Sequence, residues 1–295
     1  MRWRYIIILL WIFQTFSLSA QVVSSGKVSV YINNIPANAP VVRDNEGKLQ
    51  PGEDLTKAVR GKYYALIIGI DEYTDPSITD LTKAIRDAEL FFYAITTRYT
   101  FYTENVRFLR NATMSQIVEA LDYFAKVVGP EDNFLIFYAG HGVWDPGAEI
   151  GFWLPSDATR SSKLAWFRNS TLRDYLRAIK SNHTLLISDA CFAGSIFQTS
   201  RAFMDDASLA INKLYSLPSR KAMTSGQMTE VPDESAFLKY LVQRLIANND
   251  KYLSSQQLYS SFRLAVINNS NVVPEFGVIQ DVGDQGGDFI FILRE

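Results

Sequence analysis

The chain has 295 residues, of which 47% are apolar and 20% charged, and this balance suits one sizeable α/β domain with short appendages. Its formal net charge of -2 provides no excess of basic residues with which to bind a nucleic acid. A single cysteine, Cys191, excludes an internal disulfide bond.

The first residues have the pattern of a secretory signal. Arg2 and Arg4 precede the apolar run YIIILLWIF, and small residues follow within QTFSLSAQ. The apolar run is shorter than the ~20 residues of a membrane-spanning helix, which favours cleavage after Ala20 or Ser19 over an uncleaved membrane anchor. We therefore expect residues 1–20 to be a signal peptide that exports the protein to the periplasm or the cell exterior.

Residues 21–60 are polar and interrupted by proline and glycine, which predicts an extended leader or pro-segment with one short strand within residues 27–32. The folded domain is then expected over residues 61–295. We expect a first part that ends near residue 198, a mobile loop over 199–219 and a last part over 220–295.

Apolar runs and helical spacing alternate through this domain. Strands are predicted over 63–70, 105–109, 150–154, 220–224 and 289–293, and over the runs that begin at 133 and 184. Helices are predicted over 80–99, with Asp80 as its cap, and over 113–128, 170–180, 235–247 and 254–266. This alternation indicates an α/β fold with a mostly parallel central sheet of about six strands, covered by helices on both faces as an α/β/α sandwich.

Two of the predicted strands end on reactive residues. The stretch NFLIFYAGHG, residues 133–142, leads to His141, one of two histidines, and TLLISDACFAG, residues 184–194, leads to Cys191. Both read as buried parallel strands, so their ends can be neighbours at one edge of the sheet.

A thiol and an imidazole at these positions permit acyl transfer. A free thiol titrates near pKa ~8.5, and an imidazole within hydrogen-bond reach can take its proton and return it to a leaving amine. The main-chain N–H groups of Gly142 and Cys191 are candidate donors to an oxyanion. The alternative for Cys191 is a small buried apolar residue, and His183 reads only as a polar loop residue at a strand start.

An acid precedes the cysteine. Asp189 lies two residues before Cys191, on the same side of the strand end. A carboxylate beside a thiolate is costly unless a cation is expected there, and a basic substrate side chain would supply one. The alternative is that Asp189 caps a helix that starts at Cys191.

The motifs YAGHG and DACFAG together resemble those of the caspase-like cysteine peptidases (clan CD, peptidase C14), and most closely their bacterial metacaspase-like branch. The likeness extends from Tyr63 to the C-terminus. It implies that His141 is the base, Cys191 the nucleophile, and Gly142 and Cys191 the oxyanion donors. It also implies a pocket for Arg or Lys at the P1 position, formed by Asp189 and by Asp87, which lies in RDA, residues 86–88.

The resemblance carries further implications. AMTSG, residues 222–226, matches the strand that binds the substrate main chain, which makes Ser225 a candidate binding residue. Phe192-Ala193 replaces the usual His-Ser pair after the cysteine, which affects subsite shape. Calcium is implied by the resemblance only. The sequence itself requires no cofactor and predicts no metal site, and Asp205-Asp206 alone is thin evidence for calcium binding.

The sequence thus predicts an exported, monomeric cysteine endopeptidase with peptide or protein substrates that have a basic P1 residue. Two alternatives remain open, an inactive caspase-like binding module and a transpeptidase with the same dyad. A zymogen that trims itself at Arg43, Lys57, Arg60, Arg201 or Lys213 is a further hypothesis, and its alternative is that these are solvated charges on disordered segments.

Overall fold

The computed structural model describes residues 31–32, 35–36, 61–190, 196–197, 211–226 and 235–294. The chain divides into two units, Met1–Val41 and Val42–Glu295. In the first unit, two short strands, β1 (Tyr31–Ile32) and β2 (Ile35–Pro36), pair antiparallel. The expected signal peptide and most of the expected leader lie outside the described residues.

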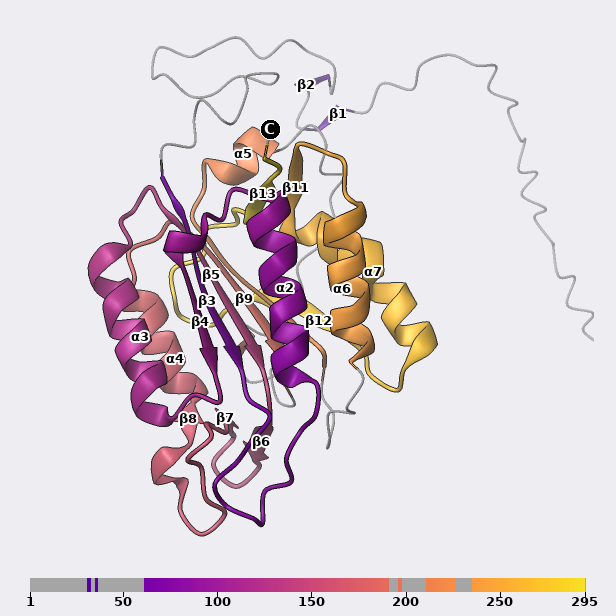
Figure 1. Ribbon diagram of the computed structural model, residues 1–295. Helices are drawn as coiled ribbons and strands as arrows, with labels where there is room; N and C mark the ends of the chain where they lie inside the picture. Colours follow the sequence, from indigo (N-terminus) through magenta and orange to yellow (C-terminus); the bar gives the residue numbers. More distant parts are fainter. Residues whose placement is uncertain are drawn as a thin grey trace, which may run out of the picture. The chain divides into compact units, whose positions relative to one another are not determined.

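A six-stranded sheet forms the centre of the second unit, in the order β12-β10-β9-β5-β3-β4 (Figure 1). The first five strands along the chain are parallel, and β12 pairs antiparallel with β10. This confirms the predicted mostly parallel sheet. The strands are β3 (Tyr63–Gly69), β4 (Val106–Arg110), β5 (Asn133–Ala139), β9 (His183–Asp189), β10 (Ser219–Thr224) and β12 (Glu275–Val278).

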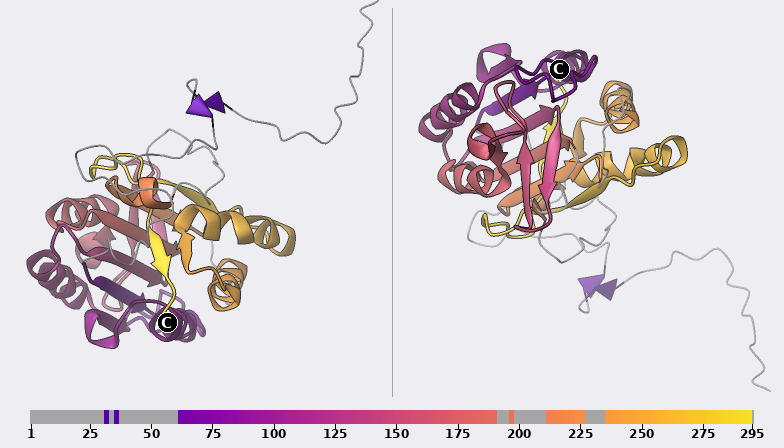
Figure 2. Two further views of the ribbon diagram at one scale, coloured as in Figure 1. Left: turned by 90° about the horizontal axis from the view of Figure 1, so that it is seen from above. Right: turned by 90° about the horizontal axis from the view of Figure 1, so that it is seen from below.

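The strands β3, β5 and β9 are rich in apolar residues because both of their faces are buried. In β3, Tyr63, Ala65 and Ile67 enter one hydrophobic core, while Tyr64 and the residues that alternate with it enter the other. One core lies under α2 (Ala84–Arg98), α6 (Ala236–Ala247) and α7 (Ser255–Asn269). The other lies under α3 (Met114–Val127) and α4 (Asn169–Ala178), which gives three layers (Figure 2).

Hydroxyl side chains begin three of these helices. Thr113 and Ser254 form capping boxes at α3 and α7, and Ser235 caps α6. The expected cap of α2 is wrong, because α2 begins at Ala84 and the Asp80 carboxylate instead accepts the Tyr73 N–H at 2.8 Å. Asp71, in the loop after β3, instead accepts a hydrogen bond at the start of this helix: its Oδ1 accepts the Ile85 N–H at 3.2 Å.

Two smaller sheets flank the central one. At the carboxyl end of the central strands, β6 (Gly142–Asp145), β7 (Ile150–Trp153) and β8 (Phe167–Arg168) pair antiparallel (Figure 1). The predicted strand at the C-terminus exists as β13 (Ile290–Ile292), but it pairs with β11 (Tyr252–Ser254) outside the central sheet.

The expected loop over 199–219 is wrong in its last part. Within it, a short helix, α5, spans Ile211–Tyr215, and β10 already starts at Ser219. Two single-turn 3-10 helices, Thr103–Asn105 and Lys163–Ala165, complete the described elements. Among the helices that the structure describes, none has the length and apolar character needed to cross a membrane.

Candidate active site

The register of β5 and β9 sets the site. The two strands are adjacent and parallel, and their last rung pairs Ala139 with Asp189. His141 follows Ala139 by two residues, and Cys191 follows Asp189 by two residues. The chain therefore leads to the two candidate catalytic positions from the same rung of neighbouring strands. Cys191 itself lies outside the described residues, which reach Ala190 in this part of the chain.

The main chain of His141 is held on both sides. Its N–H donates to the Tyr73 hydroxyl at 2.9 Å. Its carbonyl accepts the Tyr138 hydroxyl at 2.7 Å and the Leu154 N–H at 3.0 Å. Gly140 permits this arrangement, because a Cβ there would lie 2.9 Å from the Tyr138 hydroxyl.

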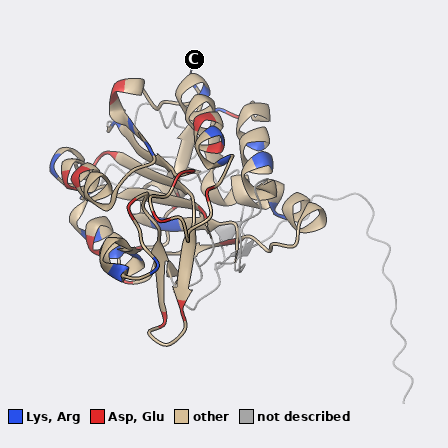
Figure 3. Cartoon of the chain, turned by 60° about the horizontal axis from the view of Figure 1, so that its bottom comes forward, with Lys and Arg blue, Asp and Glu red and all other residues tan. Residues whose placement is uncertain are grey.

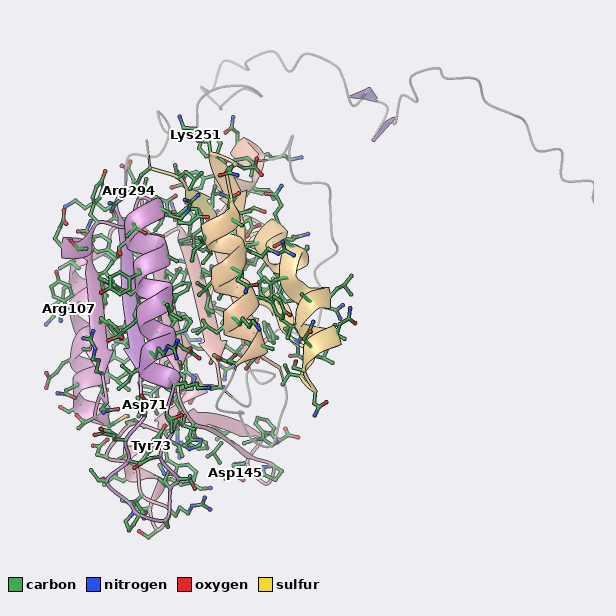
Figure 4. All side chains as sticks on the ribbon, turned by 45° about the vertical axis from the view of Figure 1, so that its right-hand side comes forward. Asp71, Tyr73, Arg107, Asp145, Lys251 and Arg294 are labelled. Carbon is green, nitrogen blue, oxygen red and sulfur yellow. The ribbon has the colours of Figure 1, made fainter. Side chains whose placement is uncertain are left out.

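The imidazole has a defined orientation. His141 Nε2 lies 2.7 Å from the Thr79 carbonyl oxygen, and the Tyr73 ring lies 5.0 Å away, centre to centre. A carbonyl oxygen only accepts, so Nε2 carries the proton, and Nδ1 is the basic nitrogen of the neutral ring. Figure 4 shows Tyr73 with Asp71 at the carboxyl end of the central strands.

Gly142, the expected oxyanion donor, begins β6. It pairs with Trp153, and the Leu154 N–H donates to the His141 carbonyl just outside this pair. That pattern defines a non-hydrogen-bonded antiparallel pair, in which the main-chain N–H points away from the partner strand. Because β6 is the edge strand of its sheet, the Gly142 N–H is directed out of the ladder.

Asp189 ends β9 as a buried carboxylate, 4% exposed. Burial raises the pKa of Asp189, and hydrogen bonds from the Ser235 and Ser225 hydroxyls partly offset the rise. Its Oδ1 has no hydrogen-bond partner in the part of the chain that the structure describes. Ser225, just after β10, is anchored by its N–H, which donates to the Ser188 carbonyl at 3.1 Å.

Asp87 lies in the first turn of α2 and interacts with Asp189. Burial and then the charge of Asp189 raise the pKa of Asp87 to about 7, although Arg86 and Lys83 lower it in part. Asp87 and Ser225 thus each lie close enough to Asp189 to affect, or be affected by, its carboxyl group. Seen from the carboxyl end of the sheet, acidic residues lie among the loops around the strand ends (Figure 3).

A pocket of about 500 Å³ opens beside these acids, between α2 and α6. Asp87 and Ser235, both partners of Asp189, are in its wall. The other residues of the wall include Lys83, Arg86, Lys239, Tyr240, Gln243 and Asn269. Asp87 therefore borders open space, and Asp189 lies behind the pocket wall in contact with Ser235.

Sequence reasoning missed Tyr73, Thr79 and Ser235. Tyr73 and Thr79 contact His141 across 68 and 62 positions of the chain, and no local pattern marks such contacts. A serine ahead of the apolar spacing of α6 was a signal for a helix cap but not for a partner of Asp189.

His183 is not part of the site. It begins β9, at the end opposite to Asp189, and its ring stacks on Tyr215 with centres 4.0 Å apart. Burial lowers the pKa of His183 to about 4. The expectation of a polar loop residue is wrong, because the side chain is buried in a strand.

No metal centre is built by the described residues. Within them, no group of three or more His, Cys, Asp and Glu side chains is arranged to hold an ion. Asp205-Asp206, the thin sequence evidence for calcium, lies outside the described residues.

Comparison with known proteins gives a family and a fold. A family model described as a caspase domain matches residues 62–278. No curated protein matches the chain. Among solved structures, the crystal structure of protein GSU0716 from Geobacter sulfurreducens is similar with a TM-score of 0.52 and 21% sequence identity, covering 74% of this chain and 93% of that chain. At this identity the likeness shows the fold alone.

Proposed function

Because the chain belongs to the caspase-domain family of cysteine peptidases, we propose that it is an endopeptidase that cleaves after Arg or Lys. The observation that carries the proposal is the fixed orientation of the His141 imidazole, in which Nδ1 is the basic nitrogen. His141 and Cys191 each follow the same Ala139–Asp189 rung by two residues, on adjacent parallel strands. A peptidase that uses a thiol needs a base in such a place.

In this proposal, Cys191 gives its proton to His141 Nδ1, and its Sγ bonds to the substrate carbonyl carbon. The N–H groups of Gly142 and Cys191 stabilise the oxyanion, each by about 3 kcal/mol. The C–N bond then breaks as His141 returns the proton to the leaving amine. Finally, a water that loses a proton to His141 hydrolyses the thioester, which releases the acid and restores the thiol.

The acid pair supports a basic P1 residue. In the empty site, the charge of Asp189 adds to the effect of burial in raising the pKa of the half-buried Asp87, because two negative charges close together repel. An Arg or Lys side chain between them removes this cost and supplies donors for the Oδ1 of Asp189, which lacks a partner in the described structure. Substrates with neutral or acidic P1 residues would supply neither.

A fluorogenic peptide assay of wild type and four variants tests this function. We expect wild type to cleave after Arg, and Cys191→Ala and His141→Ala to abolish turnover. Asp189→Ala is expected to lower Arg turnover by several orders of magnitude. His183→Gln is the matched control, because it changes the other histidine at the far end of β9.

Other outcomes would select the alternatives. No turnover of any peptide by wild type would favour an inactive binding module, and a product that carries an added amine would favour a transpeptidase. Unchanged Arg turnover in Asp189→Ala would reject the assigned pocket.

Self-processing is a second proposal that follows from a basic P1 preference. Of the candidate sites, Lys213 lies within α5, so cleavage there requires the helix to open first. We therefore expect cleavage at the other basic residues, and N-terminal sequencing of wild type beside Cys191→Ala tests it. Identical mature ends would remove the proposal.

A further inference from the structure

One segment of the chain, residues 71–80, contacts His141 at two points. The Tyr73 hydroxyl accepts the main-chain N–H of His141 at 2.9 Å, and the Thr79 carbonyl lies 2.7 Å from its Nε2. The first contact acts on the main chain and the second on the ring. Together they restrict both the position of Cα and the rotation of the imidazole.

The segment is itself anchored. The N–H groups of Asp71 and Glu72 donate to Asn111 Oδ1 at 2.9 and 3.1 Å. Tyr73 N–H donates to Asp80 Oδ1 at 2.8 Å, which joins Tyr73 to the residue beside Thr79. With these bonds made, neither contact to His141 can shift without breaking others.

Tyr73 is suited to a fixed position. It is buried, 8% exposed, and its ring packs against the imidazole at 5.0 Å with the ring planes tilted by 39°. Burial raises the pKa of Tyr73, so its hydroxyl stays neutral at the pH of any peptidase assay. The hydroxyl is the acceptor for a partly buried N–H that would otherwise lack a partner in the described structure.

We propose that Tyr73 is a positioning residue that holds His141 in the orientation for proton transfer with Cys191, which rests on the proposed function. Removing the hydroxyl leaves the His141 N–H unsatisfied, so the residue shifts to find another partner. A shift of this kind misdirects Nδ1, and misplacement by about 1 Å can cost about a hundredfold in rate.

The test is Tyr73→Phe, which keeps the ring and removes only the acceptor. We expect kcat to fall by about tenfold to a hundredfold, with KM for an Arg peptide within about twofold of wild type. Tyr99→Phe is the matched control: Tyr99 is also buried, and its hydroxyl donates to a main-chain carbonyl, that of Leu245, at 2.8 Å. We expect Tyr99→Phe to lower stability but to keep kcat.

A second readout needs no substrate. Cys191 is the single cysteine, so the pH dependence of its alkylation by iodoacetamide reports one thiol. We expect the wild-type midpoint to lie below that of a free thiol, pKa ~8.5, and to rise in both His141→Ala and Tyr73→Phe but not in Tyr99→Phe.

The kinetic and alkylation measurements distinguish a failure of the proposed dyad from a failure of the positioning role of Tyr73. A midpoint near ~8.5 in wild type, unchanged in His141→Ala, would overturn the dyad and with it the proposed function. A depressed wild-type midpoint that rises in His141→Ala but not in Tyr73→Phe, together with unchanged kcat in Tyr73→Phe, would overturn the positioning role alone.

Discussion

Changing Asp87 to Asn tests whether the acid pair recognises a cation. The Asp87 carboxyl lies beside Asp189 in a half-buried position, and its pKa is raised to about 7. A protonated carboxyl carries no charge to attract an arginine side chain. The preference for Arg at P1 should therefore increase as the pH rises through this value.

The expected size of the effect follows from the pKa of about 7. Asp87 is ionised in about 10% of free molecules at pH 6 and about 90% at pH 8. If only the ionised form binds the cation, the preference for Arg rises about ninefold between these pH values. Asp87→Asn removes the titrating group, so the rise should shrink to less than about twofold.

The assay compares two peptides that differ only in Arg or citrulline at P1. Both are cleaved by the same His141 and Cys191, so the ratio of their kcat/KM values cancels the titration of the dyad. A wild-type ratio that stays flat from pH 6 to 8, or the same rise in Asp87→Asn, would refute the reasoning. A matched substitution outside the pair, Arg86→Gln, should leave a pH-dependent ratio because Asp87 remains.

Two further predictions concern stability. His183 has a folded pKa of about 4 against a reference value of 6.5, so the unfolded state takes up the proton first and stability is lost as the pH falls from 6.5 to 4. At pH 4, this titration lowers the free energy of unfolding of wild type by about 3 kcal/mol, and we expect His183→Gln to remove that loss. Urea unfolding at pH 7 and pH 4 measures it, and a pH dependence in His183→Gln equal to that of wild type would contradict the prediction. Lys221 and Asp284 form a buried ion pair, with side chains 9% and 8% exposed. Asp284→Ala leaves the Lys221 charge unpaired and should cost about 3 kcal/mol or more in urea unfolding, whereas Asp174→Ala, in an exposed pair with Arg177, should cost less than about 1 kcal/mol.

Local sequence patterns predicted most of the central sheet. The strands β3, β5 and β9 are buried on both faces, so each contains a run of consecutive apolar residues that the sequence shows directly. Edge strand β12 was missed because its residues are mostly half-buried and the run Glu275–Val278 is short. Asp80 was expected to cap α2, but the loop after β3 brings Asp71 to that position instead.

By itself, the sequence determined the order of the main strands and helices and the places of His141 and Asp189 at strand ends, because each follows a local pattern of apolar runs. The family resemblance added Asp87. Only the tertiary structure decided which groups hold them. Tyr73 and Thr79 reach His141, and Ser235 reaches Asp189, through loops and neighbouring elements far apart in the chain. Contacts of this kind leave no periodicity in the sequence, since they depend on how separate elements pack rather than on any one of them.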